Sequence, residues 1–176
     1  MQNFASLIGQ WGEFFSTTAQ ISGGLVGLVF VALTFKPQAL GIAGEPGDRT
    51  LRRLARQTFL DFLNVMLVSL LMLVPYSELQ IGASIALVGG IGFGRGLQRV
   101  VAVLAGPEAR PRAEVVRLFL LSTVGNLLLV IAGLAAAIGR IDDTAFWSLV
   151  FTSMILLLVS GTRSAWMLLM HEALED

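Results

Sequence analysis

Polar and small residues recur at steps of three or four along residues 4–35, an otherwise apolar stretch. They are Ser6, Gln10, Glu13, Thr17, Gln20, Gly24 and Gly27. At 100° per residue, these positions fall on one helical stripe roughly 100° wide. Polar groups that face hydrocarbon stay unsatisfied, so we expect this stripe to face protein or water.

Two interpretations of the stripe are open. In the first, it is a wet face that lines a pore, vestibule or ligand cleft, with Glu13 at the outer mouth and Thr17, Gln20 and Gly24 further in. Several copies around one axis would then arrange their Glu13 carboxylates as a ring that attracts cations. In the second, the outer half of the helix stands above the membrane with a solvated face. Gly23 and Gly27 also form G-x-x-x-G, a surface that permits close approach of another helix.

A second polar group lies where residues 50–74 enter the membrane. Asp61 and Asn64 share one helical face with Gln57, and Arg95 and Arg99 lie at a similar expected depth on the next helix. The structural interpretation is a pair between Asp61 and Arg95 or Arg99 that joins the two helices. The functional alternatives are a gate on the cytoplasmic side, or an arginine pair that binds anionic lipid headgroups.

The stretch VGGIGFGRGLQRV, residues 88–100, contains five glycines and two arginines, Arg95 and Arg99, which are one helical turn apart. It lacks G-x-G-x-x-G, since Arg95 and Leu97 occupy the places of the last glycine, and it follows no expected strand. Gly82, Gly89 and Gly96 recur every seven residues, which predicts a close-packing face for another helix. Asn126, in the middle of its own span, is expected to hydrogen-bond across to a neighbouring helix.

Catalytic chemistry has little support in the sequence. There is no cysteine, and the one histidine, His171, lies in the C-terminal tail. The usual protease and hydrolase motifs are absent, and an intramembrane metal or haem would need histidine ligands there. We therefore expect no enzymatic activity, no cofactor and no metal site. A net charge of zero also argues against nucleic acid as a partner.

The composition of the chain indicates what kind of structure positions these residues. Of 176 residues, 55% are hydrophobic and 14% charged, and the mean hydropathy is +0.78. An ordinary soluble domain carries about 25% charged residues. The chain is therefore predicted to be an all-α, polytopic bundle of five transmembrane helices, forming a single integral membrane domain over residues 1–176. The expected helices cover about 4–35, 50–74, 79–104, 112–139 and 144–170.

The basic residues predict the orientation of these spans. Lys36 to Arg56 holds five of them and Arg95 to Arg117 five more, whereas the N-terminal tail and the turn after Pro75 hold none. Short basic loops stay in the cytoplasm. Alternation then places the N-terminus outside and the C-terminus in the cytoplasm.

The segment GGLVGLVFVALTF carries a G-L-x-F-V-A-L signature over residues 27–33. At this position it resembles small multi-pass bacterial inner-membrane proteins of uncharacterised families. The resemblance implies a bacterial inner-membrane location, but no activity and no site residues.

Two functions are compatible with these observations. The first is a homo-oligomeric channel or pore, with cations as the candidate permeant species and the first helix lining the path. The second is a non-catalytic subunit, adaptor or regulator that binds another membrane protein or lipid. In both, the partners are the lipid bilayer and other copies or chains, and the small-residue surfaces favour a homo-oligomer.

Overall fold

The computed structural model describes residues 4–34, 49–74, 77–105 and 112–170, and it is helical throughout these ranges apart from short turns. The described helices are α1 (Phe4–Thr34), α3 (Arg49–Leu73), α4 (Glu78–Ala105), α5 (Arg112–Ala137) and α6 (Asp143–Met170). For this part of the chain, the prediction of an all-α protein with five helices is confirmed.

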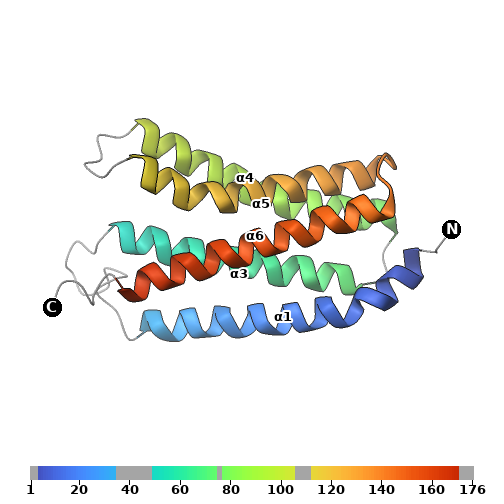
Figure 1. Cartoon of the computed structure of the whole chain (residues 1–176), viewed down its shortest axis with the longest axis horizontal. Helices are drawn as coiled ribbons and strands as arrows, with labels where there is room; N and C mark the ends of the chain where they lie inside the picture. The colour runs from blue at the N-terminus through green and yellow to red at the C-terminus, as the bar shows by residue number, and fades with distance from the viewer. Residues whose placement is uncertain (1–3, 35–48, 75–76, 106–111, 171–176) are drawn as a thin grey trace.

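The helices run side by side along the long axis of the molecule and alternate in direction (Figure 1). Their spatial order differs from their chain order, because α4 packs on α5, α5 on α6, α6 on α3, and α3 on α1. Contacts between the consecutive helices α3 and α4 are much fewer. α1 consequently lies at one edge of the bundle and α4 near the opposite edge.

Local signals in the sequence explain where the helices begin and end. Ser77 and Gln80 form a reciprocal capping box at the start of α4, with Ser77 N donating to Gln80 Oε1 at 3.2 Å. Asp142 caps α6 by accepting a hydrogen bond from the backbone N–H of Ala145. α5 ends at Ala137 and is followed by Gly139, whose φ of 62° is left-handed, and Arg140 N donates to Ala135 O in a Schellman motif.

Glycines bring α4 and α5 into close contact. A Cβ atom added at Gly82 would lie 2.7 Å from the backbone of Gly133, and one at Gly89 would lie 2.7 Å from the Cβ of Leu129. One added at Gly96 would lie 2.5 Å from Thr123 Oγ1. The three glycines spaced by seven residues thus all face α5, because only a missing side chain lets the two backbones approach so closely.

Aliphatic and aromatic side chains fill the middle of the bundle. Val65, Val68, Ile85 and Leu157 are fully buried there. At one end of the bundle, Trp11 of α1 stacks on Trp147 of α6, with ring centroids 6.0 Å apart and planes 12° apart. This stack ties the beginning of α1 to the rest of the bundle.

Four helices of the described chain are long and apolar enough to cross a membrane. The spans are Trp11–Thr34, Leu54–Leu73, Phe119–Ala137 and Asp143–Leu168. α4 is as long as α6, but its glycines and two arginines lower its hydropathy, and it is not among the four. These four spans support an integral membrane protein.

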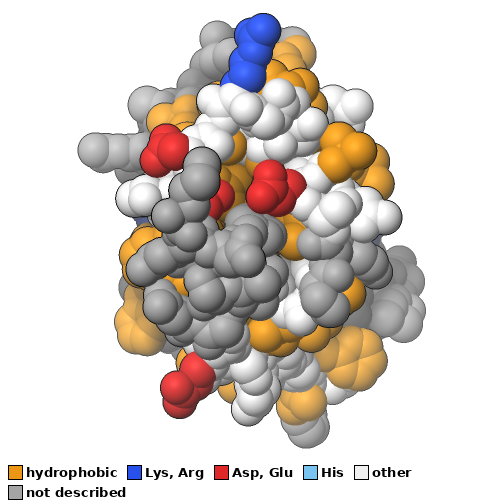
Figure 2. All heavy atoms as spheres, turned by 90° about the vertical axis from the view of Figure 1, so that its right-hand side faces the viewer, with side chains coloured by type: hydrophobic (Ala, Val, Ile, Leu, Met, Phe, Trp, Pro, Cys, Tyr) orange, Lys and Arg blue, Asp and Glu red, His pale blue; other side chains and the backbone are white. Residues whose placement is uncertain are grey.

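Charges differ between the two ends of the bundle. The end where α1 begins presents several acidic side chains and little basic surface (Figure 2). The acidic residues Glu78, Asp142 and Asp143 belong to it, at the starts of α4 and α6. Arg52, Arg56, Arg99 and Arg163 belong to the opposite half.

Candidate functional site

A buried polar cluster lies between α3, α5 and α6, and its centre is the carboxylate of Asp61. Only 2% of Asp61 is exposed. Ser122 Oγ of α5 donates to Asp61 Oδ1 at 2.6 Å, and Ser160 Oγ of α6 donates to Asp61 Oδ2 at 2.8 Å. Each carboxylate oxygen therefore has a donor from a different helix, which satisfies a group that is costly to bury alone.

A pair of amides extends the cluster by one turn toward the middle of the bundle. Asn64 Nδ2 of α3 donates to Asn126 Oδ1 of α5 at 3.0 Å, and Asn126 Nδ2 donates to the carbonyl of Ser122 at 2.8 Å. Gly92 of α4 lies directly against this amide pair, and a Cβ there would overlap Asn126 Oδ1. Asn126 therefore forms an interhelical hydrogen bond, and its partner is Asn64.

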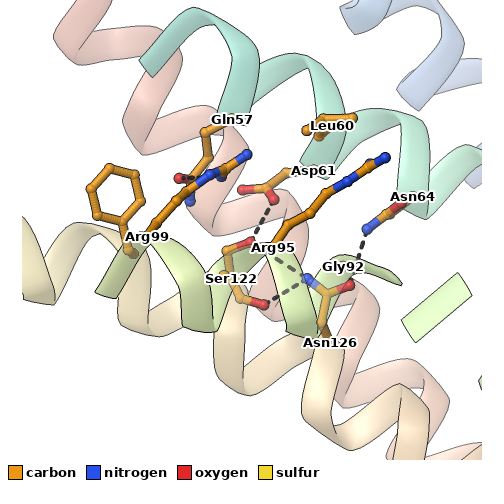
Figure 3. A pocket seen from close by; sticks show the side chains of 11 residues that line it. Gln57, Leu60, Asp61, Asn64, Gly92, Arg95, Arg99, Ser122 and Asn126 are labelled. Carbon is orange, nitrogen blue, oxygen red and sulfur yellow. Dashed lines mark hydrogen bonds between the residues drawn. The ribbon is translucent and has the colours of Figure 1, made fainter. Parts of the chain in front are cut away.

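The two arginines of α4 lie beside the cluster without joining it directly (Figure 3). Arg99 Nη1 donates to Gln57 Oε1 at 3.0 Å. Among the described residues, Arg95 makes no hydrogen bond or ion pair, and its side chain is exposed. No ion pair within this range links Asp61 to either arginine, although Arg99 is near enough to act on its charge.

Within the described residues, the structure thus shows Asp61 bonded to serines and not directly to Arg95 or Arg99. The reason is the packing of the helices. α4 packs along α5 and contacts α3 little, and Arg99 bonds to Gln57, while the serines of α5 and α6 bond to the carboxylate. Sequence reasoning missed Ser160 as a partner, because nothing in the chain order indicates that α6 packs beside α3.

A small pocket opens between the arginines and the cluster. Its walls are residues of α3, α4 and α5. The centre of a water molecule can occupy about 10 Å³ of this pocket, so the pocket has room for about one water molecule. The lining residues include Gln57, Leu60, Asn64, Gly92, Arg95 and Arg99. Within the described residues, no three acidic, histidine or cysteine side chains gather into a metal site.

The cluster suits binding and helix association better than covalent catalysis. Ser122 and Ser160 donate their hydroxyl protons to a carboxylate, and the described residues include no histidine or lysine that could activate either hydroxyl. What the arrangement provides chemically is a fixed carboxylate next to two guanidinium groups.

The polar stripe of α1 lies elsewhere, on the face that points away from the bundle. Glu13, Thr17, Gln20, Gly24 and Gly27 are all exposed. No atom would meet a Cβ added at Gly24 or Gly27. The structure does not bring this stripe near Asp61.

The opposite side of α1 packs on α3. Phe15, Thr18 and Ser22 are buried there, and a Cβ added at Gly23 would lie 3.5 Å from the sulfur of Met66. The two glycines of the G-x-x-x-G pattern therefore differ: Gly23 lies beside α3, whereas Gly27 belongs to the exposed stripe.

Comparison with known proteins adds no constraint. No protein-family model, no curated protein and no solved structure matches the chain.

Proposed function

We propose that this protein is a homo-oligomeric, cation-attracting channel of the bacterial inner membrane, with copies that meet along α1 and a path between them. The observation that carries the proposal is the exposed stripe of α1. Its seven positions from Glu13 to Thr34 follow steps of four and three: Glu13, Thr17, Gln20, Gly24, Gly27, Val31 and Thr34, all exposed.

Contact of such a stripe with lipid is energetically unfavourable. The part of α1 that is apolar enough to cross a membrane runs from Trp11 to Thr34, so in a membrane the amide of Gln20 and the hydroxyl of Thr17 would face hydrocarbon in a lone subunit. Polar groups in a bilayer are covered by protein or water. Alternating steps of four and three are also the period of helices that supercoil around one another. Assembly through α1 would cover the polar groups of the stripe and would account for its spacing.

The proposal includes five spans with the start of α1 outside. α4 has 28 residues, which is about 42 Å of helix, and it lies antiparallel to its neighbour α5 along the same axis as the four apolar spans. Its low hydropathy has two sources, the glycines, three of which pack on α5, and the two arginines Arg95 and Arg99. The basic half of the bundle then faces the cytoplasm, in agreement with the positive-inside rule.

In this assembly, Glu13 stands at the outer mouth of the path. Its side chain is exposed and lies about one half-turn inside Trp11, where the span of α1 begins. A ring of such carboxylates concentrates cations near the entrance. Thr17 and Gln20 supply hydroxyl and amide groups further along.

One observation favours a second function, that of a non-catalytic subunit or adaptor that binds another membrane protein through α1. The inner half of the stripe consists of Gly24, Gly27, Val31 and Thr34. Small residues at these steps suit a dry contact between two helices. In that case the stripe is covered by a different polypeptide and no water enters.

Single cysteines on α1 distinguish these functions, because the natural chain contains none. Thr17→Cys, Gln20→Cys and Gly24→Cys place a thiol on the stripe. Ile21→Cys and Phe30→Cys are matched controls, since both residues are exposed on α1 but lie about 80–100° to either side of it. Two readouts are needed: oxidative cross-linking between copies, and modification by a membrane-impermeant cationic thiol reagent.

For the channel, stripe cysteines cross-link copies and react with the reagent, while control cysteines do neither. Cross-linking without reagent access means a dry homo-oligomer and contradicts conduction along α1. If no copies cross-link and the protein is recovered only with another polypeptide, the adaptor is correct. Bilayer recordings complete the test, since Glu13→Gln should lower cation current if the ring exists and leave it unchanged otherwise.

A further inference from the structure

We propose that Arg95 and Arg99 bind the phosphate of an anionic lipid headgroup at the mouth of the crevice between α3 and α4. The site is defined by these two arginines together with Gln57, Leu60 and Gly92. This proposal requires the chain to lie in a membrane, but it does not depend on whether the protein conducts ions.

The crevice exists because α4 is held by α5 rather than by α3. Gly82, Gly89 and Gly96 bring α4 against α5, while α3 packs mainly on α1 and α6. Where α3 and α4 separate, Gly92 and Gly96 belong to the α4 wall of the pocket, and they pack closely on Asn126 and Thr123 of α5. The pocket between α3 and α4 is partly open, and Figure 3 shows Arg95, Arg99, Gln57 and Leu60 around it.

The polar groups on the floor of the crevice already have partners. Asp61 accepts from Ser122 and Ser160, and the amides of Asn64 and Asn126 bond to each other. Because their hydrogen bonds are already formed, these groups need no ligand to satisfy them. With Asp61 ionised, its one negative charge leaves the two guanidinium groups with one positive charge in excess.

The donors that remain belong to the arginines. A guanidinium has five N–H groups. Arg99 uses one nitrogen on Gln57, and Arg95 uses none on any described residue. Since the two residues are four apart on α4, their side chains lie on one face of the helix and can approach the same anion. Paired guanidinium groups match the geometry of phosphate oxygens.

The depth of the site favours a lipid as the source of that phosphate. Arg99 contacts Gln57, which lies about 5 Å along α3 from Leu54, where the apolar span begins. A guanidinium at this depth is costly without a counter-ion. Long arginine side chains extend toward the headgroup layer, and anionic lipids place their phosphates there.

Lipid binding by the purified protein tests the proposal. Protein in detergent is mixed with equal amounts of phosphatidylglycerol and phosphatidylcholine, and the bound lipids are counted by native mass spectrometry. The decisive variant is Arg95→Gln, because Arg95 has no described protein partner and its loss should not disturb folding. Arg163→Gln is the matched control, since Arg163 is exposed in the same half of the bundle but lies on α6, outside the crevice.

We expect the wild type to retain phosphatidylglycerol in preference to phosphatidylcholine. Arg95→Gln should lower this preference about fivefold, which is the factor for one basic residue at an anionic membrane surface. Arg163→Gln should keep it. Equal retention of the two lipids by the wild type, or an unchanged preference in Arg95→Gln, overturns the proposal.

A second arm separates lipid from free phosphate. Thermal unfolding is followed with added phosphatidylglycerol, phosphatidylcholine or inorganic phosphate. Stabilisation by phosphatidylglycerol alone, lost in Arg95→Gln, supports the lipid site. Stabilisation by inorganic phosphate without any effect of phosphatidylglycerol contradicts the lipid as ligand.

Discussion

Ser160 donates its hydroxyl proton to the carboxylate of Asp61 at 2.8 Å, although the two residues are 99 positions apart in the chain. The bond joins α6 to α3, and Ser122 supplies the corresponding bond from α5. One carboxylate thus links three helices in the interior of the bundle. Its contribution to stability can be measured directly.

Removing either serine hydroxyl should destabilise the protein. Ser160→Ala or Ser122→Ala leaves one carboxylate oxygen buried without its donor, and we expect a loss of about 1–3 kcal/mol in the free energy of unfolding. The measurement is reversible unfolding in mixed micelles. Ser148→Ala is the control, because Ser148 is exposed on α6 and bonds only to its own helix, through the carbonyl of Thr144. Equal stability of Ser160→Ala and Ser148→Ala would contradict a stabilising role for the Asp61 contact.

Gly92→Ala should break the Asn64–Asn126 hydrogen bond. The added methyl group would occupy the position of Asn126 Oδ1, so the amide pair must move, and overpacking of this kind costs about 1–3 kcal/mol. Gly90→Ala is the matched control, since no atom lies within 4 Å of its Cβ position. The unfolding free energies of the two variants are compared under one condition. If they change by the same amount, the contact with Gly92 is not tight.

Gly133→Ala should be more damaging than Gly92→Ala. Its Cβ would meet backbone atoms of Gly82 and Ala86, which cannot rotate away as a side chain can. We expect α4 and α5 to separate, with a loss of about 3 kcal/mol or more and low yield of folded protein. Size-exclusion chromatography and thermal unfolding report both effects. A well-folded variant of wild-type stability would show that the two backbones are farther apart.

Gly27→Leu separates contacts within a subunit from contacts between subunits. Nothing in the bundle lies within 4 Å of the Cβ position of Gly27, so the unfolding free energy of the monomer should change by less than about 0.5 kcal/mol. The oligomer should weaken, because the larger side chain keeps neighbouring helices apart. Analytical ultracentrifugation in detergent measures the assembly. An oligomer that forms as well as the wild type excludes close packing at Gly27.

Trp11→Ala should loosen the beginning of α1. The indole ring of Trp11 stacks on Trp147 and contacts Phe14 and Phe151 at their edges, and aromatic pairs contribute about 0.5–1.5 kcal/mol beyond buried area. Hydrogen exchange of the first turns of α1 should therefore accelerate. Trp166→Ala is a suitable control, because Trp166 is 60% exposed. Unchanged exchange in Trp11→Ala would mean that α1 is held by α3 alone.

The five helices were predictable because their signals are local. The capping box at Ser77 and the Schellman motif at Gly139 act over a few residues, and the apolar runs between them are continuous. The same holds for the α4 glycines, whose spacing of seven already defines one face of a helix. Local signals of this kind do not depend on how the helices are arranged.

The partners of the polar residues depend on that arrangement and were harder to predict. Asp61 and Arg99 are at similar depths on consecutive helices, which suggested a pair, but α6 packs beside α3 and supplies Ser160 instead. Nothing in the sequence indicates that the spatial order of the helices differs from their order in the chain. The stripe of α1 was visible in the sequence, whereas its direction, away from the bundle, required the packing of Phe15 and Ser22 on α3.

The contacts of Asp61 also bear on how the protein is made. The residue leaves the ribosome 61 positions ahead of Ser122 and 99 ahead of Ser160, a delay of several seconds at about 5–20 residues per second. During this interval α3, with a mean hydropathy of 1.3, is the least apolar of the four spans and has no donor from α5 or α6 for its buried acid. We therefore expect newly made α3 to stay beside the insertion machinery, or near water, until its later neighbours are synthesised.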